Sequence, residues 1–170
     1  MDWRGFELHP EVPAGGMPTS RLFPPEMLGQ FEQHLNLVAD RFGVGRPLRL
    51  GDHLPSSRAA LAMTEHAREQ GRLNPFREAV MDAYWLDGLD LESPDELGGV
   101  AGEVGLDAAA ARASMDDPAY LGRVDALRDE AAGLAVTGIP TFFFGEARII
   151  GCEPYEVLAQ ATVAAGAARR

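Results

Sequence analysis

The chain has 170 residues, of which 46% are hydrophobic and 24% are charged, as in one globular domain of ordinary size. Its 15 basic residues, all arginine, are outnumbered by 26 acidic residues, which gives a net charge of −11. This balance argues against nucleic acids and anionic membranes as partners, because both are bound through clustered cations. The single cysteine, Cys152, excludes an internal disulfide. With no long apolar run and no signal-like beginning, we expect a cytoplasmic protein.

The first residues predict a short strand followed by a loop. Within residues 3–9, Phe6 and Leu8 are separated by one polar residue, which is the two-residue period of a strand. Pro10 and the glycine- and proline-rich stretch 13–18 then predict a loop.

The central part of the chain carries successive helix signals. An apolar stripe that ends at Gly43 predicts the first helix and consists of Phe31, Leu35, Val38 and Phe42. A second helix is expected to begin after Ser56 or Ser57 and to run to Gly71. Four further helix starts are marked by a capping residue, alone or followed by proline: Asn74-Pro75, Ser93-Pro94, Asp107 and Asp117-Pro118.

The end of the chain changes to a strand pattern. Thr141–Phe144 and Ala147–Ile150 flank Gly145-Glu146, which predicts a tight hairpin with a type II′ turn and Phe144 paired with Ala147. The pair Glu153-Pro154 predicts the start of a last helix, with Glu153 as its N-cap.

The segment Thr137-Gly138-Ile139-Pro140-Thr141 leads directly into this hairpin. A proline is tolerated at the first residue of a strand, because its missing N–H can face outward. The ordinary trans bond and a cis bond are both open here, since cis X–Pro costs only about 0.5–1 kcal/mol. In the cis form, the backbone of Ile139 would turn outward at a sheet edge, where an extended peptide could pair with it.

Several of these segments resemble one family in the order in which they occur. Residues 138–144, followed by Ile149-Ile150-Gly151 and a helix, resemble the cis-proline hairpin of thioredoxin-fold proteins. Residues 3–10, Trp-Arg-Gly-Phe-Glu-Leu-His-Pro, resemble the second core strand of the DsbA-like family typified by FrnE. That family is related to kappa-class glutathione transferases and 2-hydroxychromene-2-carboxylate isomerases. Further family-like segments extend the resemblance over nearly the whole chain: residues 54–60, 76–84 and 103–107.

The resemblance implies an α/β chain with a thioredoxin-like fold that is interrupted by a helical insertion. It divides the chain into a remnant strand and loop at 1–18, a helical insertion at 19–116 and a C-terminal thioredoxin-fold part at 117–170. It also implies that a thiol or peptide substrate binds at the cis-proline loop, which consists of Gly138, Ile139 and Pro140.

The chain departs from the family in ways that concern catalysis. The family begins with a strand, a Cys-x-x-Cys motif and a helix, whereas here Met1 stands two residues before Trp3. We therefore expect a truncated chain that lacks the first strand and the Cys-x-x-Cys helix. Ser56 and Leu61 stand where the family usually has Asn and His. No catalytic residue is carried over.

Cys152 carries the only thiol in the sequence, and its position bears on whether that thiol is reactive. The predicted register places Ile139 opposite Cys152 on strand ends about 5 Å apart, which puts the thiol beside the cis-proline loop. The start of the last helix favours a thiolate there, while Glu153 opposes it. A reactive thiol and an inert small side chain both remain open.

The other candidate groups point to no chemistry. The four histidines lack metal-ligand spacing, so we expect no metal and interpret them as solvated helix and loop residues: His9, His34, His53 and His66. Ser56-Ser57 lacks the strand–turn context of a serine hydrolase.

These observations favour a DsbA/FrnE-like thiol–disulfide oxidoreductase that cannot run a dithiol cycle with this chain alone. Two alternatives stay open: a glutathione-binding relative of the kappa transferases and isomerases, and a non-catalytic module that binds peptides at the cis-proline edge. Glutathione is the one candidate cofactor. Because the missing strand would lie between Trp3–Leu8 and Thr141–Phe144, the open edges predict self-association or a partner segment.

Overall fold

The computed structural model describes residues 1–48 and 50–167. Helices predominate, and the elements in chain order are β1 (Met17–Pro18), the short helix η1 (Thr19–Arg21), α1 (Pro25–Arg41), β2 (His53–Leu54), α2 (Arg58–Glu69), α3 (Leu73–Asp82), the helical turn η2 (Ala83–Asp87), α4 (Pro94–Glu103), α5 (Ala108–Ser114), α6 (Pro118–Gly133), β3 (Thr141–Phe144), β4 (Ala147–Ile150) and α7 (Tyr155–Ala164). None of the helices in this described part is long and apolar enough to cross a membrane.

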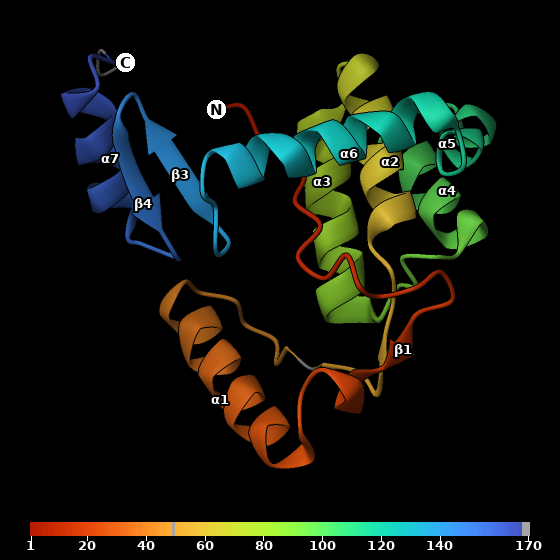
Figure 1. The fold of residues 1–170 in the computed structure, drawn as a ribbon, viewed down its shortest axis with the longest axis horizontal. Helices are drawn as coiled ribbons and strands as arrows, with labels where there is room; N and C mark the ends of the chain where they lie inside the picture. The colour runs from red at the N-terminus through yellow and green to blue at the C-terminus, as the bar shows by residue number, and fades with distance from the viewer. Residues whose placement is uncertain (49, 168–170) are drawn as a thin grey trace.

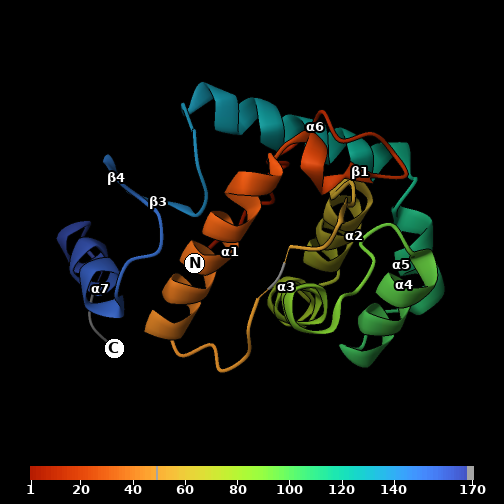
Figure 2. The same ribbon diagram turned by 90° about the horizontal axis from the view of Figure 1, so that it is seen from below.

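The elements form two groups along the long axis of the molecule. Helices α2 to α6 gather at one end, while β3, β4 and α7 lie at the other (Figure 1). Helix α6 runs along the helical group and leads into β3. Helix α1 lies below both groups in Figure 1 and between them in the view of Figure 2. The predicted boundary at residues 116/117 falls between α5 and α6, and the three-part division remains a prediction.

The apolar core lies in the helical group. Helix α2 is its centre and packs against α3, α5 and α6. Phe76, Met63 and Leu97 are fully buried there, and the cluster is completed by Ala60, Ala67, Ala101, Leu106, Ala111 and Met115. Every residue of β3, β4 and α7 keeps at least partial exposure. The stability of the molecule therefore rests on the helices.

The predicted C-terminal hairpin is confirmed in its register and its turn. Strands β3 and β4 are antiparallel, and Phe144 pairs with Ala147. Gly145 has a φ of +62°, while Glu146 keeps a negative φ, as a type II′ turn requires. A second sheet, which the sequence pattern did not predict, consists of β1 and β2 alone. Within the described residues, no third strand joins β3 and β4.

Three of the predicted helix caps are confirmed by side-chain hydrogen bonds to backbone N–H groups. Ser93 Oγ accepts from the N–H of Glu96, Asp107 Oδ1 from that of Ala110 and Asp117 Oδ1 from that of Ala119. These bonds satisfy helix-end donors that would otherwise have no partner in the helix.

Two predicted caps are wrong by one or two residues. Helix α3 begins at Leu73, so Asn74 lies inside its first turn. Pro75 fits there because the first N–H groups of a helix need no intrahelical partner. Pro154, and not Glu153, is the N-cap residue of α7.

The predicted strand at residues 3–9 is also wrong, since this segment has no regular secondary structure. No strand lies beside it among the described residues, so its backbone cannot form a ladder. The expected burial is reversed as well, because Glu7 is buried and Leu8 is 45% exposed. Ion pairs between Glu7 and two arginines explain this reversal.

The helical core yields a stability prediction. Phe76→Ala removes a fully buried ring and should lower the free energy of unfolding by about 3–5 kcal/mol, as core truncations of this size do. Urea denaturation followed by circular dichroism measures the loss. Phe42→Ala is the matched control, because Phe42 is 43% exposed and should lose less than about 1 kcal/mol. Equal losses in both variants would contradict this location of the core.

Candidate functional site

The cis-proline loop lies where β3 begins. The Ile139–Pro140 peptide bond is cis, as the family resemblance implied. The hydroxyl of Thr141 donates to the carbonyl of Gly138 at 2.6 Å and closes the loop on itself. The N–H of Gly151 donates to the carbonyl of Pro140 at 2.8 Å, which continues the hairpin pairing beyond β3. The side chain of Ile139 is 50% exposed, so the loop presents an apolar residue to solvent.

Arg148 connects this hairpin to the end of α6. Its Nη1 donates to the carbonyls of Leu134 and Ala135 at 3.2 and 3.1 Å. A cation at a helix C-terminus satisfies carbonyls that have no partner in the helix and interacts favourably with the helix dipole. Ala135 has a φ of +51°, the left-handed conformation that ends helices. Arg148 thus fixes the segment that leads into the cis-proline loop.

Cys152 lies at the same end of the hairpin as the loop. It directly follows Gly151, whose N–H pairs with Pro140, and it is exposed and free. The thiol is therefore open to solvent at the end of the hairpin that carries the cis-proline loop. Its reactivity remains a prediction.

Trp3 contacts both ends of the molecule. Its ring meets Phe142 of β3 edge-on, with the centroids 6.2 Å apart. On the helical side, the guanidinium of Arg77 lies 4.3 Å from the centre of the Trp3 ring. Arg68 donates to the Trp3 carbonyl and, at 2.7 Å, to the carboxylate of Asp2. The N-terminal segment thereby joins the hairpin to α2 and α3.

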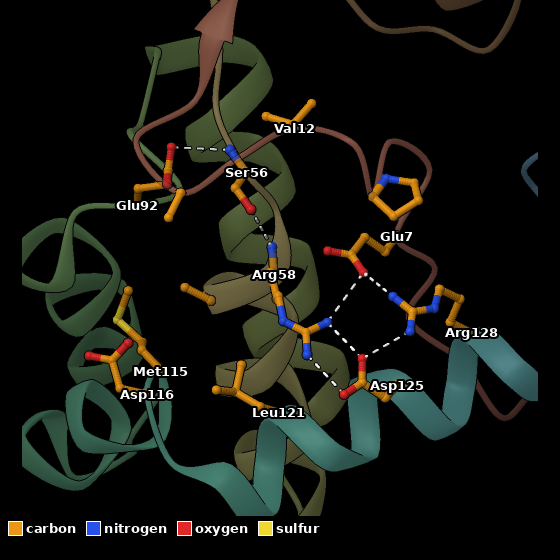
Figure 3. Close-up of a pocket in the computed structure, with 13 residues that line it drawn as sticks. Glu7, Val12, Ser56, Arg58, Glu92, Met115, Asp116, Leu121, Asp125 and Arg128 are labelled. Atoms are coloured by element: carbon orange, nitrogen blue, oxygen red, sulfur yellow. Dashed lines mark hydrogen bonds and ion pairs between the residues drawn. The ribbon is translucent and has the colours of Figure 1, made fainter.

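A pocket of about 390 Å³ opens between the N-terminal segment, α2 and α6 (Figure 3). Arg58 of α2 bonds Asp125 of α6 through both terminal nitrogens at 2.9 Å and reaches Glu7 at 3.4 Å. Arg128 approaches the same two carboxylates, at 3.3 Å from Asp125 and 3.6 Å from Glu7. Two guanidinium groups therefore neutralise two carboxylates at one wall of the pocket.

The ion pairs shift the protonation equilibria of this wall. The hydrogen bond from Arg58 is the main cause that lowers the pKa of Asp125 below its ordinary value of 3.8. The same bond raises the pKa of Arg58. Since the four charged groups of this wall already have partners of opposite sign, the wall has a structural role that links the N-terminal segment, α2 and α6. Local patterns gave no signal for Glu7 or Arg58, whereas Asp125 and Arg128 are recognisable as a helical i,i+3 pair.

Ser56 and Leu61, which stand where the resembled family usually has Asn and His, lie near the N-terminal part of the chain. The N–H of Ser56 donates to Glu92 at 3.1 Å, and Glu92 in turn accepts from the N–H of Gly15. Leu61 packs closely against Gly5. A Cβ atom on residue 5 would lie only 2.8 Å from the Cδ2 atom of Leu61. Leu61 thus packs against the N-terminal segment, and Ser56 is linked to that segment through Glu92.

One histidine differs from the expectation. His66 is buried at 7% exposure, and its Nδ1 lies 3.1 Å from the hydroxyl oxygen of Tyr120. The partner is 54 residues away in the sequence, so spacing could not reveal it. The sequence did hold one signal for the burial of His66. It lies three residues after Met63, so both side chains fall on the same, buried side of α2.

A cis-proline followed by an antiparallel hairpin and a helix, with a helical group on the chain before them, defines a thioredoxin-fold protein with a helical insertion. The chain belongs to the DSBA-like thioredoxin domain family, whose model matches residues 1–163.

The chain is also similar to individual proteins over most of its length. The uncharacterized protein YwbO of Bacillus subtilis (strain 168) is 24% identical over 165 residues, which are 95% of this chain and 80% of the relative. The crystal structure of a probable DsbA oxidoreductase from Streptomyces coelicolor has a TM-score of 0.81 and 28% identity over 95% of this chain and 73% of that one. A structure from Nitrosomonas europaea shares the fold, with a TM-score of 0.68 and 18% identity over 89% of this chain and 77% of that one.

The pocket wall yields a pH prediction. Because Arg58 lowers the folded-state pKa of Asp125, the ionised carboxylate stabilises the fold above its ordinary pKa, and this stabilisation is lost as the pH falls through the folded-state pKa. Asp125→Asn should therefore be less stable than the parent chain near neutral pH, and the difference should vanish between about pH 5 and pH 1. Urea midpoints across this range measure it.

Asp116→Asn is the matched control, because Asp116 lines the same pocket but has no ion pair among the described residues. Its effect should be small and should not follow the same pH dependence. A constant difference between Asp125→Asn and the parent chain at all pH values would contradict the assignment.

Proposed function

We propose that this chain supplies the substrate-binding part of a FrnE-type, DsbA-like thiol–disulfide oxidoreductase. The observation that carries the proposal is the exposed cis-proline loop beside Cys152. The membership in the DSBA-like family and the likeness to the Streptomyces oxidoreductase support it. A lone thiol without a disulfide suits a reducing compartment, and we place the protein in the cytoplasm.

The substrate in this proposal is an extended peptide that carries a thiol or a disulfide, and glutathione is the smallest such peptide. Ile139 has no backbone hydrogen bond within the described part of the chain, so its N–H and carbonyl are available for pairing. An extended peptide at a strand edge gains main-chain hydrogen bonds and places alternate side chains against the protein. The apolar side chain of Ile139 favours an apolar residue beside the substrate sulfur.

The redox step that one cysteine can perform is limited. The Cys152 thiolate attacks a substrate disulfide, an S–S bond forms with Cys152, and the second substrate sulfur leaves as a thiolate. Release of the bound substrate then needs another thiol, which becomes oxidised in turn. Within these 170 residues no second thiol exists, so a full dithiol cycle requires a Cys-x-x-Cys unit from outside them.

The proposal predicts the behaviour of two forms of the protein. The 170-residue chain should not reduce insulin above background, while fusion of a family strand–helix unit with Cys-x-x-Cys before Met1 should produce turnover. In the fused form, Ile139→Glu should lower turnover of a peptide disulfide by about fivefold or more, since edge contacts contribute roughly 1 kcal/mol each. Val163→Glu is the control, because Val163 is equally exposed but lies on α7.

Two outcomes would contradict the proposal. One is robust turnover by the 170-residue chain that survives Cys152→Ser, since the thiol would then be irrelevant. The other is a fused form whose turnover is lowered equally by Ile139→Glu and Val163→Glu, since the loop would then have no special part in binding.

The open hairpin leads to a further prediction about assembly. Each of its strands has one edge with no strand beside it in the described residues, and Phe143 and Ile150 are 44% and 47% exposed. Unpaired edges with apolar side chains pair readily with other chains. We therefore expect self-association at micromolar concentration, measured by sedimentation. Phe143→Lys should weaken it, while Met27→Lys on α1 should not; a monomer that binds no hydrophobic dye would contradict the prediction.

A further inference from the structure

A second pocket, of about 330 Å³, lies between the turn that joins α2 to α3 and the link between α4 and α5. It shares no lining residue with the pocket of Figure 3 and includes none of the cis-proline loop. Its lining residues are His66, Gln70, Arg72, Gly105, Leu106, Asp107 and Ala110. The basic groups of this pocket, unlike Arg58 and Arg128 of the first one, have no carboxylate partner among the described residues.

His66 is the most buried of these polar residues. The ring packs perpendicular to that of Tyr120, and its Nδ1 lies 3.1 Å from the Tyr120 hydroxyl. The other ring nitrogen, Nε2, has no hydrogen bond among the described residues, although His66 as a whole is only 7% exposed. A buried imidazole with one nitrogen held by the protein and the other left free at a pocket wall is arranged to bind something there.

Arg72 supplies a positive charge to the same pocket. Its guanidinium lies over the backbone of Gly105, where a Cβ would be 3.7 Å from Nη2. The N–H of Arg72 donates to the carbonyl of Ala67 at 2.7 Å and fixes the turn that carries the side chain. No carboxylate of the described residues lies within ion-pair distance of this guanidinium, whereas Arg58, Arg68 and Arg128 each contact two. In a chain with a net charge of −11, such a cation is available to a ligand.

The one carboxylate of the lining, that of Asp107, uses one of its two oxygens as a helix cap and keeps its negative charge at the pocket. Asp107 Oδ1 accepts the N–H of Ala110 at 2.8 Å, as the N-cap of α5. The remaining polar side chain, the amide of Gln70, can donate to an anion beside Arg72. The donors of the pocket thus outnumber its free acceptors.

We propose that this pocket binds the phosphate group of a small molecule. The guanidinium of Arg72 and the amide of Gln70 donate to the phosphate oxygens. His66, in the tautomer that carries its proton on Nε2, donates from Nε2 to the phosphate, while its Nδ1 accepts from the Tyr120 hydroxyl. The volume lies at the lower end of the range for small-molecule sites, so it leaves room for a small organic part beside Leu106 and Ala110.

Calorimetric titration with inorganic phosphate, glycerol 3-phosphate and acetate tests the proposal. Both phosphates should bind saturably, with glycerol 3-phosphate tighter because its organic part contacts the apolar side of the pocket. Arg72→Gln and His66→Gln should each weaken binding about tenfold or more, since a charge-assisted hydrogen bond contributes roughly 1.5–3 kcal/mol. Arg41→Gln, the same charge change on exposed α1, should leave binding unchanged.

A second readout keeps the test independent of misfolding. The Nε2 ¹⁵N resonance of His66 should move on addition of phosphate in the parent chain and in Arg41→Gln, and in Arg72→Gln it should move only at about tenfold higher phosphate concentration or above. Circular dichroism confirms that each variant is folded. Equal binding of acetate and phosphate, no saturable binding at all, or an equal loss in Arg41→Gln and Arg72→Gln would overturn the proposal. None of these variants touches the cis-proline loop, so the result is separate from the fate of the proposed oxidoreductase function.

Discussion

The contact of Arg58 with Glu7 and Asp125 determines how the N-terminal segment lies on the rest of the molecule. Glu7 comes from a segment without secondary structure, yet its carboxylate is buried because two guanidinium groups neutralise it. A planar guanidinium can address two carboxylates at once, which an ammonium group does less well. Removal of either arginine would leave a buried carboxylate short of partners, which is costly.

This ionic attachment also bears on the position of the cis-proline loop. Trp3, four residues before Glu7, lies between the guanidinium of Arg77 and the ring of Phe142. The N-terminal segment therefore connects β3 to the helical core. The hairpin buries none of its own residues and depends on such external contacts. The loop therefore combines an ordered backbone with open edges, which is the arrangement that the proposed peptide binding needs.

The features that the sequence predicted well are local ones. The β3–β4 turn and the caps at Ser93, Asp107 and Asp117 depend on residues within three positions, and the structure contains all of them. Residues 3–9 were wrongly predicted because a strand needs a neighbour that no local pattern guarantees. The burial of Glu7 and His66 depends on partners 51 and 54 residues away, beyond the reach of any spacing rule.

The spans of these ionic contacts bear on the order in which the molecule folds. Two pairs of core helices, α2 with α3 and α4 with α5, follow one another in the chain, so little loop-closure entropy opposes their packing. Arg58 and Asp125 are 67 residues apart, and Arg68 and Asp2 are 66 apart. Contacts between residues far apart in the sequence form slowly, because the chain loses conformational entropy before these contacts can stabilise it. The helical core should therefore fold first, and the N-terminal segment should dock onto it last.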